Sequence, residues 1–187
     1  MTVSPQHRSP LTAVARDVKK VFREIAYTTS GIADLLGPEY TQAMHAGQPA
    51  AVRYHLDSLP DSDLSFAIRA FVLRDPVSVA SLGTLLGAVN VDKLVDAGFA
   101  RETSPGSVRM LIDIRPHLIA GRQQWVFSDA DASMTQHVPG PDHVLGVGAA
   151  SLSLLQATPT SPTGRVLDLG TGSGIQVLGQ AGLSSSI

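Results

Sequence analysis

The sequence RVLDLGTGSGIQVLG, residues 165–179, predicts a strand, a tight glycine loop and the start of a helix. Its apolar run of Val166, Leu167 and Leu169 is typical of a short, buried parallel strand. Glycines at alternate positions let the backbone turn sharply and let a ligand approach without meeting a Cβ atom. Because the N–H groups at a helix start favour an anionic group, the stretch predicts a cradle for a small ligand.

Two other glycine-rich loops fit this stretch poorly. The dinucleotide fingerprint G-x-G-x-x-G would need a glycine where the chain has Ile175 or Val177. A P-loop would need Gly-Lys followed by Ser or Thr, and no such tripeptide follows the loop. The pattern therefore disfavours a nicotinamide or flavin site and excludes a P-loop.

The segment DLGTGSG resembles motif I of the class I S-adenosylmethionine-dependent methyltransferases, in which an acid precedes G-x-G-x-G at the end of the first strand. The resemblance implies S-adenosyl-L-methionine as cofactor and a Rossmann-like α/β domain. It implies that the glycine loop packs against the methionyl part of the cofactor and that the acid helps to hold its amino group. The cofactor-binding residues implied in this way are Asp168, Gly170, Thr171, Gly172 and Gly174.

The segment HVPGPDHVLGVGAASLSLL, residues 137–155, looks like the proline-bearing segment that leads into the methyltransferase domain of glutamine and nucleobase N-methyltransferases. That group includes the release-factor glutamine methyltransferases, and the whole chain is similar to an actinobacterial-type branch of it. The sequence resemblance covers about residues 137–181. Before residue 137 only the architecture is similar. It implies N-methyl transfer to a protein glutamine or a nucleobase amino group, with a release-factor-like protein or an RNA as substrate.

Two histidines of this segment, His137 and His143, are candidates for metal ligands. Two histidines without a carboxylate or thiol cluster rarely bind a metal. We therefore expect no metal site and assign both residues to the lining of the cofactor pocket or to helix capping.

The composition limits the partners and the compartment. The chain has 187 residues, 43% of them apolar, which is enough for one core or for one domain and part of another. A net charge of −2 gives no field that would attract nucleic acid or an anionic membrane. The absence of cysteine fits a cytoplasmic location. The N-terminus lacks an apolar signal region, and the most apolar stretch, residues 143–157, is too short to span a membrane.

The first part of the chain predicts a small helical bundle up to residue 58. Apolar residues recur at spacings of three and four over residues 11–25, with Ser9 as cap and Pro10 at the first helical position. Shorter helices are predicted over residues 31–37, 38–47 and 50–59. The opposite face of the first helix carries a basic stripe, which is typical of a solvated surface: Arg16, Lys19, Lys20 and Arg23.

Residues 60–131 predict a winged helix. Three helices are expected, over residues 61–75, from Ser78 to Gly87, and from Asn90 to Gly98. A strand over 108–115 follows, because apolar and polar residues alternate there. After a break at Pro116 and Gly121, residues 123–129 supply a partner strand.

The predicted third helix is poorly suited to DNA. It offers Asp92 and Asp96 against Lys93, and acidic residues outnumber basic ones between residues 60 and 131. Phosphates in a DNA groove would repel this surface. We therefore expect no tight binding to duplex DNA, and a packing or substrate-presenting role instead.

The predicted fold class is α+β, with three parts. Residues 1–131 form the helical and winged-helix-like domain, 132–164 a linker and lead-in segment, and 165–187 the first βα unit of the cofactor domain. The acid of the second strand, the Asn-Pro-Pro-Tyr-type loop and several strands of the resembled family have no match. We therefore expect an N-terminal fragment of a longer enzyme or a truncated gene product, inactive alone, whose catalytic residues are unknown.

Two alternatives remain open for the function. One is a small-molecule O-methyltransferase whose winged helix serves dimerisation. The other is a non-enzymatic winged-helix binding module.

Overall fold

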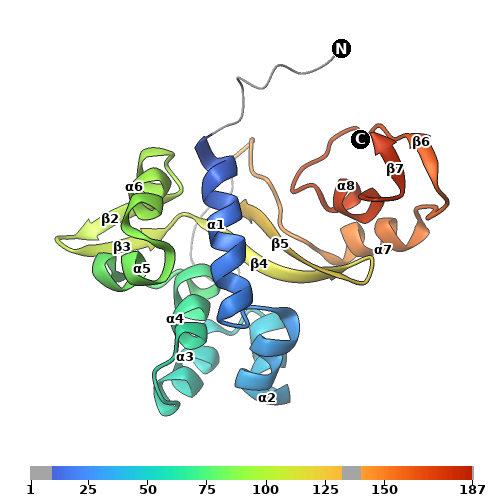
Figure 1. Cartoon of the computed structure of the whole chain (residues 1–187). Helices are drawn as coiled ribbons and strands as arrows, with labels where there is room; N and C mark the ends of the chain where they lie inside the picture. Colours follow the sequence, from blue (N-terminus) through green and yellow to red (C-terminus); the bar gives the residue numbers. More distant parts are fainter. Residues whose placement is uncertain (1–9, 132–139, 187) are drawn as a thin grey trace.

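A computed structural model describes residues 10–131 and 140–186 of the chain. Helices and strands account for 50% and 18% of it, in agreement with the predicted α+β class. Figure 1 shows the helices around a long two-stranded hairpin, with a small unit of helix and strand at the C-terminal side. Within the described residues no helix has the length and apolarity needed to cross a membrane. The predicted cap Ser9 and the candidate ligand His137 lie outside the described residues.

The helical front agrees with the predicted bundle. It comprises α1 Pro10–Glu24, α2 Thr29–His45 and α3 Pro49–Ser58. Two of the predicted short helices are joined in α2, which kinks at Gly37 (φ 71°) before Pro38. A proline breaks the hydrogen-bond ladder without stopping the chain from resuming its helical course.

The helix predicted over residues 61–75 changes type halfway. It begins as α4, Asp63–Ile68, and continues as a π-helix, η2, over Arg69–Leu73. The side chains of the four residues before Arg74 are all buried, so other parts of the chain must pack against every side of the π-helix. Arg74 ends the π-helix in the left-handed conformation, with φ 51° and ψ 42°.

Short strands and helices form the middle of the chain: β1 Val77–Ser78, α5 Val79–Leu86, α6 Ala88–Asp96, β2 Ala100–Ser104 and β3 Ser107–Met110. The strands pair antiparallel in the order β1-β3-β2, with Val77 opposite Val108. Neither β1 nor β2 was predicted, because β1 has two residues and β2 buries only Ala100.

The predicted start of α6 at Asn90 is wrong. The helix begins at Ala88, and Gly87 is its N-cap. Asn90 is buried, and its side-chain amide donates to the backbone oxygen of Leu86 at 2.8 Å and to Asp17 at 3.3 Å. Asn90 therefore ties α6 to α1 instead of capping a helix.

The strand predicted over 108–115 is divided between two sheets. It breaks at Leu111, and β4, Ile112–Ile119, pairs antiparallel with β5, Arg122–Asp129. The predicted pairing with residues 124–128 is thus confirmed for the second half of the strand only. The predicted break at Pro116 is wrong, because this residue lies inside β4 opposite Trp125. In a two-stranded sheet both strands are edges, where proline is tolerated.

An aromatic group holds the hairpin against α1. The ring centroids of Phe22 lie 4.6 Å from Tyr27 and 5.1 Å from Phe71. The Tyr27 hydroxyl donates to the backbone oxygen of Ile114 at 2.7 Å, and Trp125 Nε1 donates to the backbone oxygen of Tyr27 at 2.7 Å. Burial raises the pKa of Tyr27, so its hydroxyl stays protonated and acts as the hydrogen-bond donor.

The C-terminal unit consists of α7 Ala149–Ala157, β6 Thr163–Arg165, α8 Ile175–Gln180 and β7 Ser184–Ser186. The helix predicted from Ile175 is confirmed, and β6 and β7 pair in parallel. The buried strand predicted over residues 166–169 is wrong, because β6 ends at Arg165. Leu167 and Leu169 are 82% and 83% exposed. A parallel strand is buried by neighbours on both sides and helices on both faces, and β6 has one partner strand within the described residues.

A second apolar cluster joins this unit to the hairpin. It contains the buried side chains of Ile119 and Val126 from the hairpin and Ile175 from α8. Val147, Leu155 and Leu178 pack against it. The far end of the hairpin therefore supports the C-terminal unit.

We predict that Tyr27→Phe destabilises the protein by about 1–3 kcal/mol, because it leaves a buried carbonyl oxygen with one hydrogen bond fewer. The measurement is the free energy of unfolding in urea. Tyr54→Phe is the control, because Tyr54 is 73% exposed. Equal stability of the two variants would contradict the role assigned to the Tyr27 hydroxyl.

Candidate functional site

The glycine loop predicted as a cradle has the backbone geometry that glycine permits. The φ angles are 74° at Gly170, 51° at Gly172 and 80° at Gly174. Side chains with a Cβ atom rarely adopt these values, so the three glycines are required by the course of the backbone. A Cβ atom built on Gly170 or Gly174 would meet nothing within 4 Å, so one side of the loop is open.

Asp168 is the residue of the loop with an unsatisfied group. Its Oδ2 atom is buried and has no hydrogen-bond partner among the described residues. Its backbone oxygen accepts from the Thr171 hydroxyl at 3.3 Å. A carboxylate oxygen cut off from water without a donor costs free energy, so a donor from a ligand would stabilise it.

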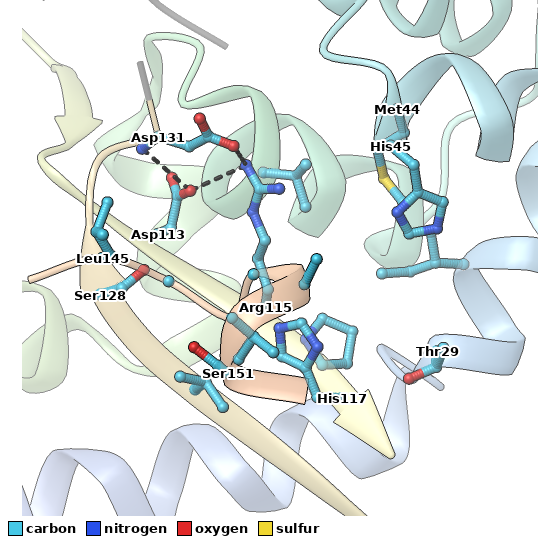
Figure 2. A pocket seen from close by; sticks show the side chains of 18 of the residues that line it. Thr29, Met44, His45, Asp113, Arg115, His117, Ser128, Asp131, Leu145 and Ser151 are labelled. Atoms are coloured by element: carbon cyan, nitrogen blue, oxygen red, sulfur yellow. Dashed lines mark hydrogen bonds and ion pairs between the residues drawn. The ribbon is translucent and has the colours of Figure 1, made fainter. Parts of the chain in front are cut away.

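A cavity of about 640 Å³ lies elsewhere, between α2, the β4–β5 hairpin and residues 143–151. Figure 2 shows His45 and Met44 from α2 facing Arg115 and His117 from β4. None of the loop residues from Asp168 to Gly174 lines it. The predicted site residues and the cavity are therefore two separate places.

Four charged side chains form one wall of the cavity and the layer behind it. Arg74 Nε lies 3.1 Å from Asp113 Oδ1, and Arg115 Nη2 lies 2.9 Å from Asp113 Oδ2. Arg115 also reaches Asp131 at 3.3 Å, and Figure 2 shows its contacts with both acids. The side chains of Arg74 and Asp113 are 3% and 2% exposed. We call these four residues the charge cluster.

Backbone groups complete the charge cluster. Arg74 Nη2 donates to the backbone oxygen of Asp131 at 2.9 Å, and the Asp131 amide donates to Asp113 Oδ2 at 3.3 Å. Burial raises the pKa of Asp113 and lowers the pKa of Arg74. Each charge is therefore maintained by its partners, and the wall that they form is fixed in place.

His117 adds an uncharged imidazole to the cavity. Burial, and then the nearby Arg115 and His45, lower its pKa to about 4. At neutral pH the ring is therefore neutral, with one nitrogen that donates and one that accepts.

His143 also lines the cavity, which is separate from the glycine loop, so its expected place in the cofactor pocket stays a prediction. Its Nδ1 atom lies 3.8 Å from Asp129 Oδ2. Within residues 10–131 and 140–186, no three metal-ligating side chains are grouped for a metal ion.

One feature of the sequence that apolar alternation does not capture belongs to this cavity. In IDIRPHL, residues 112–118, the polar residues Asp113, Arg115 and His117 occupy alternate positions and therefore share one face of the strand. The partners Arg74 and Asp131 lie far away in sequence, and no local pattern connects them to this face.

Comparison with known families gives one match. Residues 24–111 match a family model described as Domain of unknown function (DUF7059). The match runs from the end of α1 to the point where β3 ends, so it includes the π-helix and the three-stranded sheet but not the β4–β5 hairpin. No curated protein shows a significant match to the chain.

We predict that Asp113→Asn destabilises the protein by about 3–5 kcal/mol, because it leaves the buried Arg74 guanidinium without its carboxylate. Urea unfolding at pH 7 measures the change. The control is Asp96→Asn on the exposed end of α6, which should change stability by less than about 0.5 kcal/mol. A loss at Asp113 no larger than at Asp96 would contradict the assigned role.

We predict that His117 gives the stability a specific pH dependence. Its folded-state pKa of about 4 lies below the ordinary value of 6.5, so the unfolded chain takes up a proton first as the pH falls. The stabilising contribution is present above pH 6.5 and is lost as the pH falls towards 4. His117→Gln should therefore lose less stability than the unsubstituted protein between pH 7 and pH 5 in urea unfolding. Parallel losses would argue against a buried, neutral His117.

Proposed function

We propose that the chain carries the cofactor loop of an S-adenosylmethionine-dependent methyltransferase. Two observations support it: Asp168 has a buried oxygen without a hydrogen-bond partner among the described residues, and three glycines beside it are in the left-handed conformation. The oxygen needs a donor, and an ammonium group such as that of a methionyl moiety supplies one. The glycines leave one side of the loop without side chains.

The loop residues fit the cofactor in different ways. Asp168 would hold the amino group, while Gly170, Thr171, Gly172 and Gly174 would lie along the methionyl part. The cofactor supplies a methyl group on a positively charged sulfur. The chain's own contribution is to bind and orient, because methyl transfer depends on alignment of donor and acceptor.

The parallel pairing of β6 and β7 around α8 supports a Rossmann-like domain for this segment. Strand, glycine loop, helix and parallel strand follow in that order from Thr163 to Ser186. In such sheets a ligand lies beyond the carboxyl end of the first strand, and the glycine loop belongs to the connection that runs from that end of β6 to α8. The acceptor in this proposal is a nitrogen of a protein glutamine or of a nucleobase.

We further propose that residues 63–110 are a winged-helix unit. The order of helix, strand, two helices and two strands, with the sheet order β1-β3-β2, supports it. In this unit the turn at Pro105 and Gly106, between β2 and β3, takes the place of the wing.

The exposed surface of α6 favours a protein contact over a DNA contact. Val89 is 65% exposed and Val95 40%, and both Asp92 and Asp96 are exposed. Apolar and acidic groups together suit a protein surface and repel phosphates. This unit would accordingly present a substrate or pack against a partner.

We predict that millimolar S-adenosylmethionine shifts the amide resonances of the glycine loop in NMR spectra, and that Gly172→Val abolishes the shifts. Valine at φ 51° is strained, and its side chain would occupy the open side of the loop. Binding should be weak, because the loop supplies only one wall of a pocket.

Gly164→Val is the matched control. Gly164 lies in β6, its φ is ordinary and a Cβ atom there meets nothing within 4 Å. This variant should retain the shifts. An absence of loop shifts in the unsubstituted chain, or shifts that persist in Gly172→Val, would overturn the cofactor assignment.

We predict no retention of the chain on duplex DNA below about micromolar concentrations at physiological salt, since acidic residues outnumber basic ones in residues 60–131. Fluorescence anisotropy with a labelled duplex measures this. Tighter binding would exceed ordinary non-specific affinity and contradict a protein-facing role for α6.

A further inference from the structure

The cavity between α2, the hairpin and residues 143–151 has charges that are already paired. Arg115 contacts Asp113 at 2.9 Å and Asp131 at 3.3 Å. Arg74, which does not line the cavity, contacts Asp113 at 3.1 Å. A charged ligand would compete for one partner and leave another buried charge uncompensated. The charge cluster therefore selects against charged ligands.

Three other polar groups of the cavity are uncharged at neutral pH and can both donate and accept. The Thr41 hydroxyl is buried and has no hydrogen-bond partner among the described residues. The neutral imidazole of His117 and the hydroxyl of Ser151 line the same space. Such groups suit a ligand with a neighbouring donor and acceptor, as in an amide.

The remaining walls are mostly apolar. Ile32 and Met44 from α2 lie in the lining with Val126 from β5 and Val147 from the segment after it. A methionine thioether makes favourable contacts with aromatic rings. The volume of about 640 Å³ falls within the range of about 300–1,000 Å³ that is usual for small-molecule sites.

We propose that this cavity binds an uncharged heteroaromatic molecule that carries an amide or an equivalent donor–acceptor pair. The ring lies against Met44 and the aliphatic walls, and the amide bonds with Thr41, His117 and Ser151. The site is preformed, because the charge cluster fixes β4 and Asp131 in the absence of a ligand. The cavity is separate from the glycine loop, so this proposal does not depend on cofactor binding.

The test uses two probes with the same ring and different charge, indole-3-acetamide and indole-3-acetate. Each is titrated into the 187-residue chain at pH 7.5 and followed by amide chemical shifts in NMR spectra. Indole-3-acetamide should shift resonances of residues 113–118 and 146–151 and should bind at least tenfold more tightly than indole-3-acetate. Equal affinity, or no shift in these segments, would overturn the proposal.

Two serines of α7 give a matched pair of variants. Ser151 lines the cavity, whereas Ser153 is exposed and does not. Ser151→Ala should weaken binding of indole-3-acetamide at least threefold, and Ser153→Ala should leave it unchanged. Ala150→Phe, which adds a ring inside the cavity, should abolish binding. Thermal unfolding verifies that each variant is folded. Unchanged affinity in folded Ser151→Ala and Ala150→Phe would place the probe elsewhere and refute the site.

Discussion

The buried pair of Arg74 and Asp113 is the interaction on which the arrangement of the molecule depends. Two charges removed from water stabilise a fold only when further hydrogen bonds satisfy their remaining groups. Here those bonds come from Arg115 on the same strand and from the backbone of Asp131. The end of the π-helix, the start of β4 and the end of β5 must therefore meet at one point.

The β4–β5 hairpin extends this constraint to the rest of the chain. On one face of the hairpin lie the aromatic rings of Phe22, Tyr27 and Phe71, and Tyr27 is hydrogen-bonded to both strands. On the other face, Ile119 and Val126 support α8 and hence the glycine loop. The cavity lies along its middle, so the charge cluster that orients the hairpin also shapes the candidate ligand site.

Local sequence patterns predicted the elements that bury one face and expose the other. Alternating apolar residues predicted one strand over 108–115, which the structure divides into β3 and the first half of β4, and spacings of three and four predicted α1. Patterns failed where tertiary contacts decide: Asn90 resembled a helix cap because its hydrogen-bond partners, Leu86 and Asp17, belong to other elements. The glycine loop was predicted because a backbone with positive φ angles requires glycines, and these are visible in the sequence. The cavity was not, because its walls come from segments about a hundred residues apart.

The exposure of Leu167 and Leu169 has a consequence for the protein in concentrated solution. Both leucines follow β6 and are exposed on the surface. Exposed apolar side chains that lie close together favour association with another chain. Self-association should therefore start at this segment, promoted by salts that strengthen hydrophobic contacts and opposed by low concentrations of urea.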